Sequence, residues 1–196
     1  MDKIPNILSS FRLLLAPLFL YLFIQEDLWI RGLSLLVFTI AALTDAFDGY
    51  LARKHKVESK LGAFLDPLAD KFLTFAGFIC LPFLDPTQFP WWAIILIVLR
   101  DIIVTALRLF ASSKNLVMET RSTAKIKTAI QMGYLYVALL FGFLLLLEGG
   151  FGDWVRTIFE LNIFYWGMVA VAVITVYSGL EYLVMNRAMF KKNPSA

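Results

Sequence analysis

The chain has 196 residues, of which 60% are hydrophobic, 15% aromatic and 17% charged, and it contains one cysteine. Soluble domains average about 45–50% apolar and about 25% charged residues, so this composition excludes an ordinary soluble fold, a disordered chain and a disulfide-stabilised scaffold. The formal net charge of +3 is small and identifies no partner by itself. Six membrane helices of roughly 20 residues each would use about 120 residues. We therefore expect one membrane domain over residues 1–196 and no second soluble domain.

Six apolar segments predict membrane-spanning helices, because a span needs about 20 mostly apolar residues. The last two segments contain no Asp, Glu, Lys or Arg. We interpret the first as a retained span rather than a cleaved signal, because Arg12 and Pro17 interrupt its apolar core. In chain order, the predicted spans are 7–25, 32–52, 61–84, 91–110, 128–147 and 161–180.

The basic residues predict the orientation of these spans. Most Lys and Arg lie before the first span, in the second and fourth connections, or after the last span, and Arg31 and Arg156 are exceptions. By the positive-inside rule, both termini and the second and fourth connections then face the cytoplasm. The sequence therefore predicts an all-α, multi-pass protein of the cell membrane with six transmembrane helices and both termini cytoplasmic.

Four aspartates lie within the second and third predicted spans: Asp45, Asp48, Asp66 and Asp70. An Asp at the centre of a span costs roughly 2.5–3.5 kcal/mol, so four unpaired ones would cost on the order of 10 kcal/mol. The spacing puts each pair on one face of its helix, and the short connection 54–61 allows the two faces to meet. Converging carboxylates repel unless they are protonated or bind cations. Oxygen ligands without His or Cys select Mg²⁺, Mn²⁺ or Ca²⁺, and four aspartates could bridge two such ions.

Two small residues and an arginine follow on the same face of the second span. Gly49 and Ala52 leave the backbone open to close approach by a phosphorylated ligand, and Arg53 is placed to bind a phosphate. The alternative is that the aspartates pair with Arg53 and Lys71 only to hold the helices together, which offers two bases for four acids.

Eight residues of this region form one spaced pattern within 26 positions: Asp45, Asp48, Gly49, Ala52, Arg53, Gly62, Asp66 and Asp70. This pattern resembles, without a departure, the signature of the CDP-alcohol phosphatidyltransferase family. The resemblance implies a fold of six membrane helices, which agrees with the number of spans predicted from hydropathy. The family also suggests a homodimer. The predicted orientation places the active site at the cytoplasmic side of the bilayer, and we expect no nucleic-acid partner.

The resemblance also implies a role for each signature residue. The four aspartates would ligate two divalent cations, Mg²⁺ or Mn²⁺, that hold the pyrophosphate of CDP-diacylglycerol. The CDP pocket would be lined by Gly49, Ala52, Arg53 and Gly62. Asp70 would also act as the general base on the hydroxyl of the acceptor alcohol, and CMP would leave.

Similarity to the family extends over most of the chain, including residues 4–6, 64–71, 100–103 and 125–128. It points to members that use glycerol 3-phosphate as the acceptor. Another alcohol, such as inositol phosphate, is the alternative within the family. From other classes, a cation transporter or a non-catalytic scaffold is possible, but a transporter leaves Gly49 and its neighbours without a role.

A glycerol 3-phosphate acceptor carries a dianion, so its site needs fixed cations. The candidates lie on or near the predicted cytoplasmic halves of the fourth and fifth spans: Arg100, Arg108, Lys125 and Lys127. Arg100 lies within a span, so it must face either a polar cavity or the neighbouring Asp101.

Two residues in this region depart from the pattern of the similar members. Asp101 stands where Glu is usual, and Ala124 stands where Gly is usual.

Overall fold

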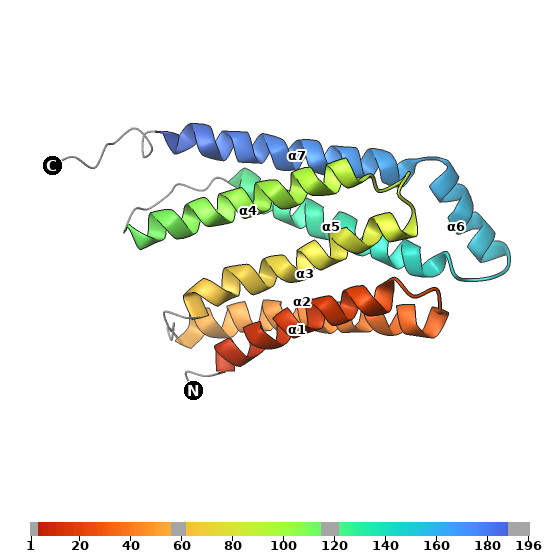
Figure 1. Cartoon of the computed structure of the whole chain (residues 1–196), viewed down its shortest axis with the longest axis horizontal. Helices are drawn as coiled ribbons and strands as arrows, with labels where there is room; N and C mark the ends of the chain where they lie inside the picture. Colours follow the sequence, from red (N-terminus) through yellow and green to blue (C-terminus); the bar gives the residue numbers. More distant parts are fainter. Residues whose placement is uncertain (1–3, 56–61, 115–121, 188–196) are drawn as a thin grey trace.

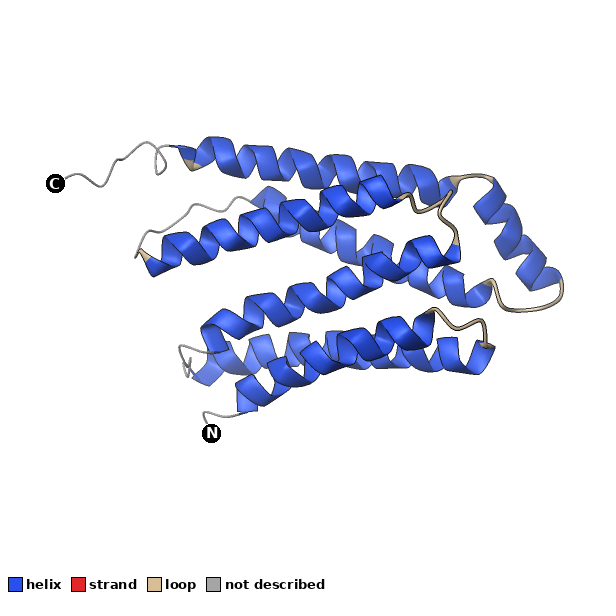
Figure 2. Ribbon diagram, in the orientation of Figure 1, coloured by secondary structure: helices blue, strands red, loops and turns tan. Residues whose placement is uncertain are grey.

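The computed structural model describes residues 4–55, 62–114 and 122–187, and it describes side chains for residues 12–44, 71–114, 123 and 126–187. All regular structure in these residues is helical (Figure 2). The helices are α1 (Ile4–Phe23), α2 (Leu28–His55), α3 (Gly62–Leu84), α4 (Trp91–Ser113), α5 (Ser122–Leu144), α6 (Gly150–Glu160) and α7 (Ile163–Met185).

Each of the six predicted spans overlaps one long helix, from α1 to α5 and α7. Within the residues whose side chains are described, two apolar stretches are long enough to cross a membrane, namely Ile126–Leu144 in α5 and Ile163–Met185 in α7. Large apolar side chains also face outward on other helices: Leu14 is 70% exposed and Trp29 is 85% exposed. Apolar surface of this extent is typical of contact with lipid or a partner. The crossing of all six helices stays a prediction.

The long helices form two groups that share α3 (Figure 1). In the first group, α1 packs against both α2 and α3. In the second, α7 packs against α4 and α5, and α3 contacts both of these helices. The α1–α2 turn, the α3–α4 connection and α6 lie at one end, which we call the distal end (Figure 1). Helix α2 ends and α3 begins at the opposite end, which we call the motif end.

Helix α6 lies in the connection between the last two predicted spans, and the sequence analysis did not predict it. Its buried residues, Gly152, Val155 and Phe159, recur at spacings of three and four, which is the period of one helix face. Gly149 precedes it with φ of 85°, a conformation that glycine adopts without steric cost. The helical signal was therefore present, but it is short and lies between two much stronger apolar segments.

Polar side chains at the distal end cap helices and join connections. The Asp27 carboxylate accepts hydrogen bonds from the backbone N–H groups of Trp29 and Ile30, both at 2.9 Å. These donors would otherwise be unpaired in the first turn of α2. Gln88, before α4, donates to the Asn162 side chain at 2.8 Å and accepts from the Tyr165 N–H at 3.2 Å, which ties this connection to the start of α7.

Arg31 joins α1, α2 and α5 at the distal end. Its guanidinium is buried and donates from Nε to the carbonyl oxygens of Phe23 and Gln25, at 3.0 and 3.1 Å. Its Nη1 donates to the carbonyl of Gly142 in α5 at 3.1 Å. Helix α5 also lies close to α1 and α3 here, because a Cβ added at Gly142 would lie 3.3 Å from Cζ of Phe23 in α1 and 2.4 Å from a methyl carbon of Leu84 in α3. Arg31 therefore pairs carbonyl groups at the end of α1 that have no helical donor.

We expect Arg31→Ala to lower the Tm of the purified protein by about 6–12 °C, because buried carbonyls left without a donor cost about 1–3 kcal/mol each. Thermal unfolding in detergent measures this. The matched control is Arg156→Ala, because Arg156 is exposed and pairs with exposed Asp153, an arrangement worth about 0–1 kcal/mol. Equal shifts for both variants would contradict the role of Arg31.

Candidate functional site

The signature residues lie on two neighbouring helices. Asp45 and Asp48 belong to the second half of α2, and Asp66 and Asp70 belong to the first turns of α3. Helices α2 and α3 are in contact, and these parts of both helices lie at the motif end (Figure 1). The side chains of all eight signature residues lie outside the described part of the chain, so their predicted roles stay predictions. Among the side chains that are described, no group of three His, Cys, Asp or Glu could hold a metal ion.

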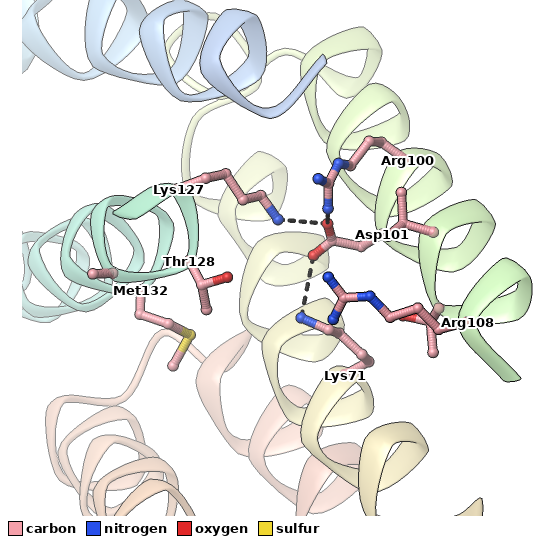
Figure 3. A pocket seen from close by; sticks show the side chains of 10 residues that line it. Lys71, Arg100, Asp101, Arg108, Lys127, Thr128 and Met132 are labelled. Atoms are coloured by element: carbon pink, nitrogen blue, oxygen red, sulfur yellow. Dashed lines mark hydrogen bonds and ion pairs between the residues drawn. The ribbon is translucent and has the colours of Figure 1, made fainter. Parts of the chain in front are cut away.

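A cavity of about 550 Å³ lies among α3, α4 and α5 (Figure 3). We call it the cation cavity, because the charged residues that line it, within the described part of the chain, are Lys71, Arg100, Asp101, Arg108 and Lys127. Four of these five side chains are cationic. Such an excess of positive charge in a partly enclosed space attracts anions.

The carboxylate of Asp101 is the centre of this cluster. Its Oδ1 lies 2.5 Å from Lys127 Nζ and 3.0 Å from Arg100 Nη1, and its Oδ2 lies 3.4 Å from Lys71 Nζ (Figure 3). Gln131 Nε2 is 3.5 Å from Oδ2. Asp101 is 1% exposed and Lys127 is 2% exposed, so each buried charge has the partner that burial requires.

Arg100 is held from two helices. Besides Asp101, its Nη2 donates to the hydroxyl of Ser178 in α7 at 2.9 Å. The Ser178 hydroxyl in turn donates to the carbonyl of Thr175 at 2.9 Å. A Cβ added at Gly179 would lie 2.9 Å from Arg100 Cγ, so the absence of a side chain there makes room for the arginine. The two sequence-based possibilities for Arg100 both hold, because it pairs with Asp101 and also lines the cavity.

Among the described cations of the cavity, Arg108 is the one without an ion pair to Asp101. Its guanidinium carbon lies 5.2 Å from the ring centroid of Tyr182 in α7, a cation–π contact that positions the group without neutralising it. Within the described residues, Arg108 makes no ion pair. Figure 3 shows it extending toward the same space as Lys71. It is thus available to pair with an anion in the cavity.

The structure brings together three of the four cations predicted for an acceptor phosphate, namely Arg100, Arg108 and Lys127. The side chain of Lys125 lies outside the described part. From the sequence, Lys71 was expected only as an alternative partner of the signature aspartates, whereas its amine contacts Asp101 and lines the cavity. Gln131 was not among the predicted site residues, although an amide within an apolar span is the signal that could have indicated it.

Comparisons with known proteins give the family. The family profile described as CDP-alcohol phosphatidyltransferase matches residues 2–177. The chain is 34% identical over 191 residues to a Shigella flexneri protein named CDP-diacylglycerol–glycerol-3-phosphate 3-phosphatidyltransferase, covering 95% of this chain and 96% of that protein. A Rickettsia typhi protein of the same name is 33% identical over 140 residues, covering 71% and 78%.

A Cereibacter sphaeroides protein of the same name is 40% identical over 145 residues, which are 71% of this chain. The match spans 63% of that relative, less than two thirds of its length. The profile match covers most of the chain and includes all eight signature residues. The chain therefore belongs to the CDP-alcohol phosphatidyltransferase family.

Proposed function

We propose that this protein is a phosphatidylglycerophosphate synthase, which transfers the phosphatidyl group of CDP-diacylglycerol to glycerol 3-phosphate and releases CMP. The relatives carry the name of this reaction. The observation that carries the proposal for this chain is the cation cavity, where four cationic side chains face one carboxylate. A phosphate monoester dianion is the part of glycerol 3-phosphate that such a cavity binds.

The position of the cavity along α3 supports the same acceptor. Lys71, which lines the cavity, directly follows Asp70 of the signature. The two residues are about 1.5 Å apart along the helix axis. An acceptor whose phosphate lies in the cavity would therefore be bound beside α3, the helix that carries Asp66 and Asp70.

The signature residues fit a metal-assisted reaction. Four carboxylates on two neighbouring helices are the hard oxygen ligands that Mg²⁺ and Mn²⁺ prefer. Two such ions, held by these aspartates, would neutralise charge on the pyrophosphate of CDP-diacylglycerol. In this proposal, Gly49, Ala52, Arg53 and Gly62 line the pocket for the CDP group.

Asp70 is the general base in the proposed reaction. It takes the proton of the acceptor hydroxyl, and the hydroxyl oxygen forms a bond to the phosphorus nearest the diacylglycerol. The bond from that phosphorus to the CMP-side oxygen breaks, and CMP leaves with that oxygen. Most of the work of the protein is to position the reactants and to stabilise charge.

The lipid substrate requires a bilayer, and we propose that all six long helices cross it with the motif end at the cytoplasmic side. The two long apolar stretches and the outward apolar side chains support this topology. A water-soluble acceptor then reaches the cavity from the cytoplasm, and the lipid reaches the same level from the membrane. A homodimer remains an expectation from the family.

The test of this proposal is CMP release by purified protein in mixed micelles with CDP-diacylglycerol and Mg²⁺ or Mn²⁺. Release should depend on glycerol 3-phosphate and stop when a chelator is added. Incorporation of inositol phosphate in its place would support another acceptor. Cation flux into vesicles without CMP release would support the transporter, which the positive cavity disfavours.

We predict that Asp45→Asn lowers the rate of CMP release by about 100-fold or more, because a lost metal ligand removes several kcal/mol of charge stabilisation. The dependence of the rate on Mg²⁺ concentration should shift to higher values in any residual activity. Asp153→Asn is the control, since Asp153 is exposed in α6 at the distal end. Full activity of Asp45→Asn with unchanged metal dependence would exclude Asp45 as a ligand.

We predict that Arg108→Ala raises the KM for glycerol 3-phosphate by about 10–100-fold and leaves the KM for CDP-diacylglycerol within about twofold. The reason is that Arg108 supplies a positive charge in the cavity that is not paired with Asp101. Lys114→Ala is the matched control, because Lys114 follows the same helix and lies 4.6 Å from the Phe110 ring but outside the cavity. Equal changes in both KM values would contradict an acceptor-phosphate role.

A further inference from the structure

We propose that Asp101 is a positioning residue for the acceptor phosphate, acting through Lys127 and Arg100, which it holds in the orientation that the phosphate needs. This inference rests on the proposed function, because it concerns the site of the acceptor. It adds a role for the one acidic side chain that the structure describes in a cavity whose other described charges are cationic.

Asp101 carries a negative charge in a cavity that is proposed to bind an anion, so charge attraction to the ligand does not explain its position. A carboxylate beside an anion site weakens anion binding if charge alone decides affinity. Yet the Asp101 carboxylate lies at the centre of the cluster and is 1% exposed. Its partners come from α3, α4 and α5, the three helices that line the cavity. A single acid that joins cations from three helices fixes their relative positions.

Lys127 depends most strongly on this carboxylate. Its side chain is 2% exposed, so without Asp101 its ammonium group would be buried beside Arg100 and Lys71 with no counter-charge among the described side chains. Like charges at such distances repel, and an uncompensated buried charge moves or loses its proton. Asp101 uses one direction around the Lys127 nitrogen, and a lysine ammonium has three N–H donors. Donors therefore remain for a phosphate oxygen.

Arg100 is oriented by the same carboxylate and by α7. Its Nη1 is bound to Asp101 and its Nη2 to the Ser178 hydroxyl. These two bonds on separate nitrogens fix the plane of the guanidinium. Of these two described partners, loss of Asp101 leaves Ser178 to hold it, so the guanidinium can rotate away from the cavity.

Arg108 provides an internal reference. It is held by the ring of Tyr182 instead of Asp101, so a change at position 101 leaves its position unaltered. A variant of Asp101 therefore keeps Arg108 in place. A change in its KM for glycerol 3-phosphate then reports the alignment of Lys127 and Arg100.

The positioning role and a purely electrostatic role predict opposite signs. Asp101→Asn makes the cavity more positive, so charge alone predicts a lower KM for glycerol 3-phosphate. Loss of alignment predicts a KM about tenfold higher or more, with the KM for CDP-diacylglycerol within about twofold. Asp101→Glu keeps the charge and should restore the KM to within about fivefold of the unchanged protein. If Asp101 only stabilised the fold, Asp101→Asn would lower the Tm and the fraction of active protein but leave the KM for glycerol 3-phosphate unchanged.

The experiment measures both KM values by CMP release for the unchanged protein, Asp101→Asn, Asp101→Glu and the control Asp153→Asn. Glycerol 3-phosphate should also raise the Tm of the wild-type protein. The same rise in the Tm of Asp101→Asn should require about tenfold more glycerol 3-phosphate. A KM for glycerol 3-phosphate that is unchanged or lower in Asp101→Asn overturns the proposal. Failure of the proposed function is distinct, because the unchanged protein would then release no CMP in response to glycerol 3-phosphate.

A second pair of variants covers the case in which Asp101→Asn does not fold. The double variant Asp101→Asn with Lys127→Met removes the acid and its buried cation together, so no unpaired charge remains at position 127. We compare it with Lys127→Met alone, in which Asp101 still holds Arg100. Positioning predicts a KM for glycerol 3-phosphate at least about threefold higher in the double variant. An equal or lower KM in the double variant overturns the proposal.

Discussion

The cation cavity depends on the ion pairs that the buried carboxylate of Asp101 makes. Three cationic side chains from α3, α4 and α5 contact this carboxylate, and Lys127 is almost fully inaccessible to solvent. Burial makes each of these charges costly without a partner. The same ion pairs that make the cluster possible also bring α3, α4 and α5 to one point. The cation cavity is therefore a consequence of how these helices are held together.

Helix α3 connects the two chemical parts of the proposed site. Its first turns carry Asp66 and Asp70 of the signature, and Lys71 lines the cation cavity. It also contacts helices of both groups in the bundle. A reaction between a lipid pyrophosphate and a phosphorylated alcohol needs both substrates in fixed relative positions. One continuous helix that contributes to both subsites meets this requirement, since a helix is stiff over such a short distance.

Charged and polar residues have different roles at the two ends of the bundle. At the distal end, Asp27 caps α2 and Arg31 pairs carbonyl groups of α1 and α5. Toward the motif end, the charges of the cavity leave donors available for a ligand. The difference follows from what each group contacts: backbone carbonyl groups bind Nε and Nη1 of Arg31, whereas Arg108 lies against an aromatic ring that accepts no ordinary hydrogen bond.

Local sequence alone determined where the long helices lie and which family the chain joins. The apolar segment 91–110 predicted α4, Trp91–Ser113, because hydrophobicity along the chain is a local property. The signature spacing likewise needed only two neighbouring helices. Tertiary structure decided that Asp101 meets Lys71 and Lys127, which are 30 and 26 positions away, and that Arg31 meets Gly142, 111 positions away. These contacts depend on how whole helices pack against each other, and the pattern within a single segment does not contain that information.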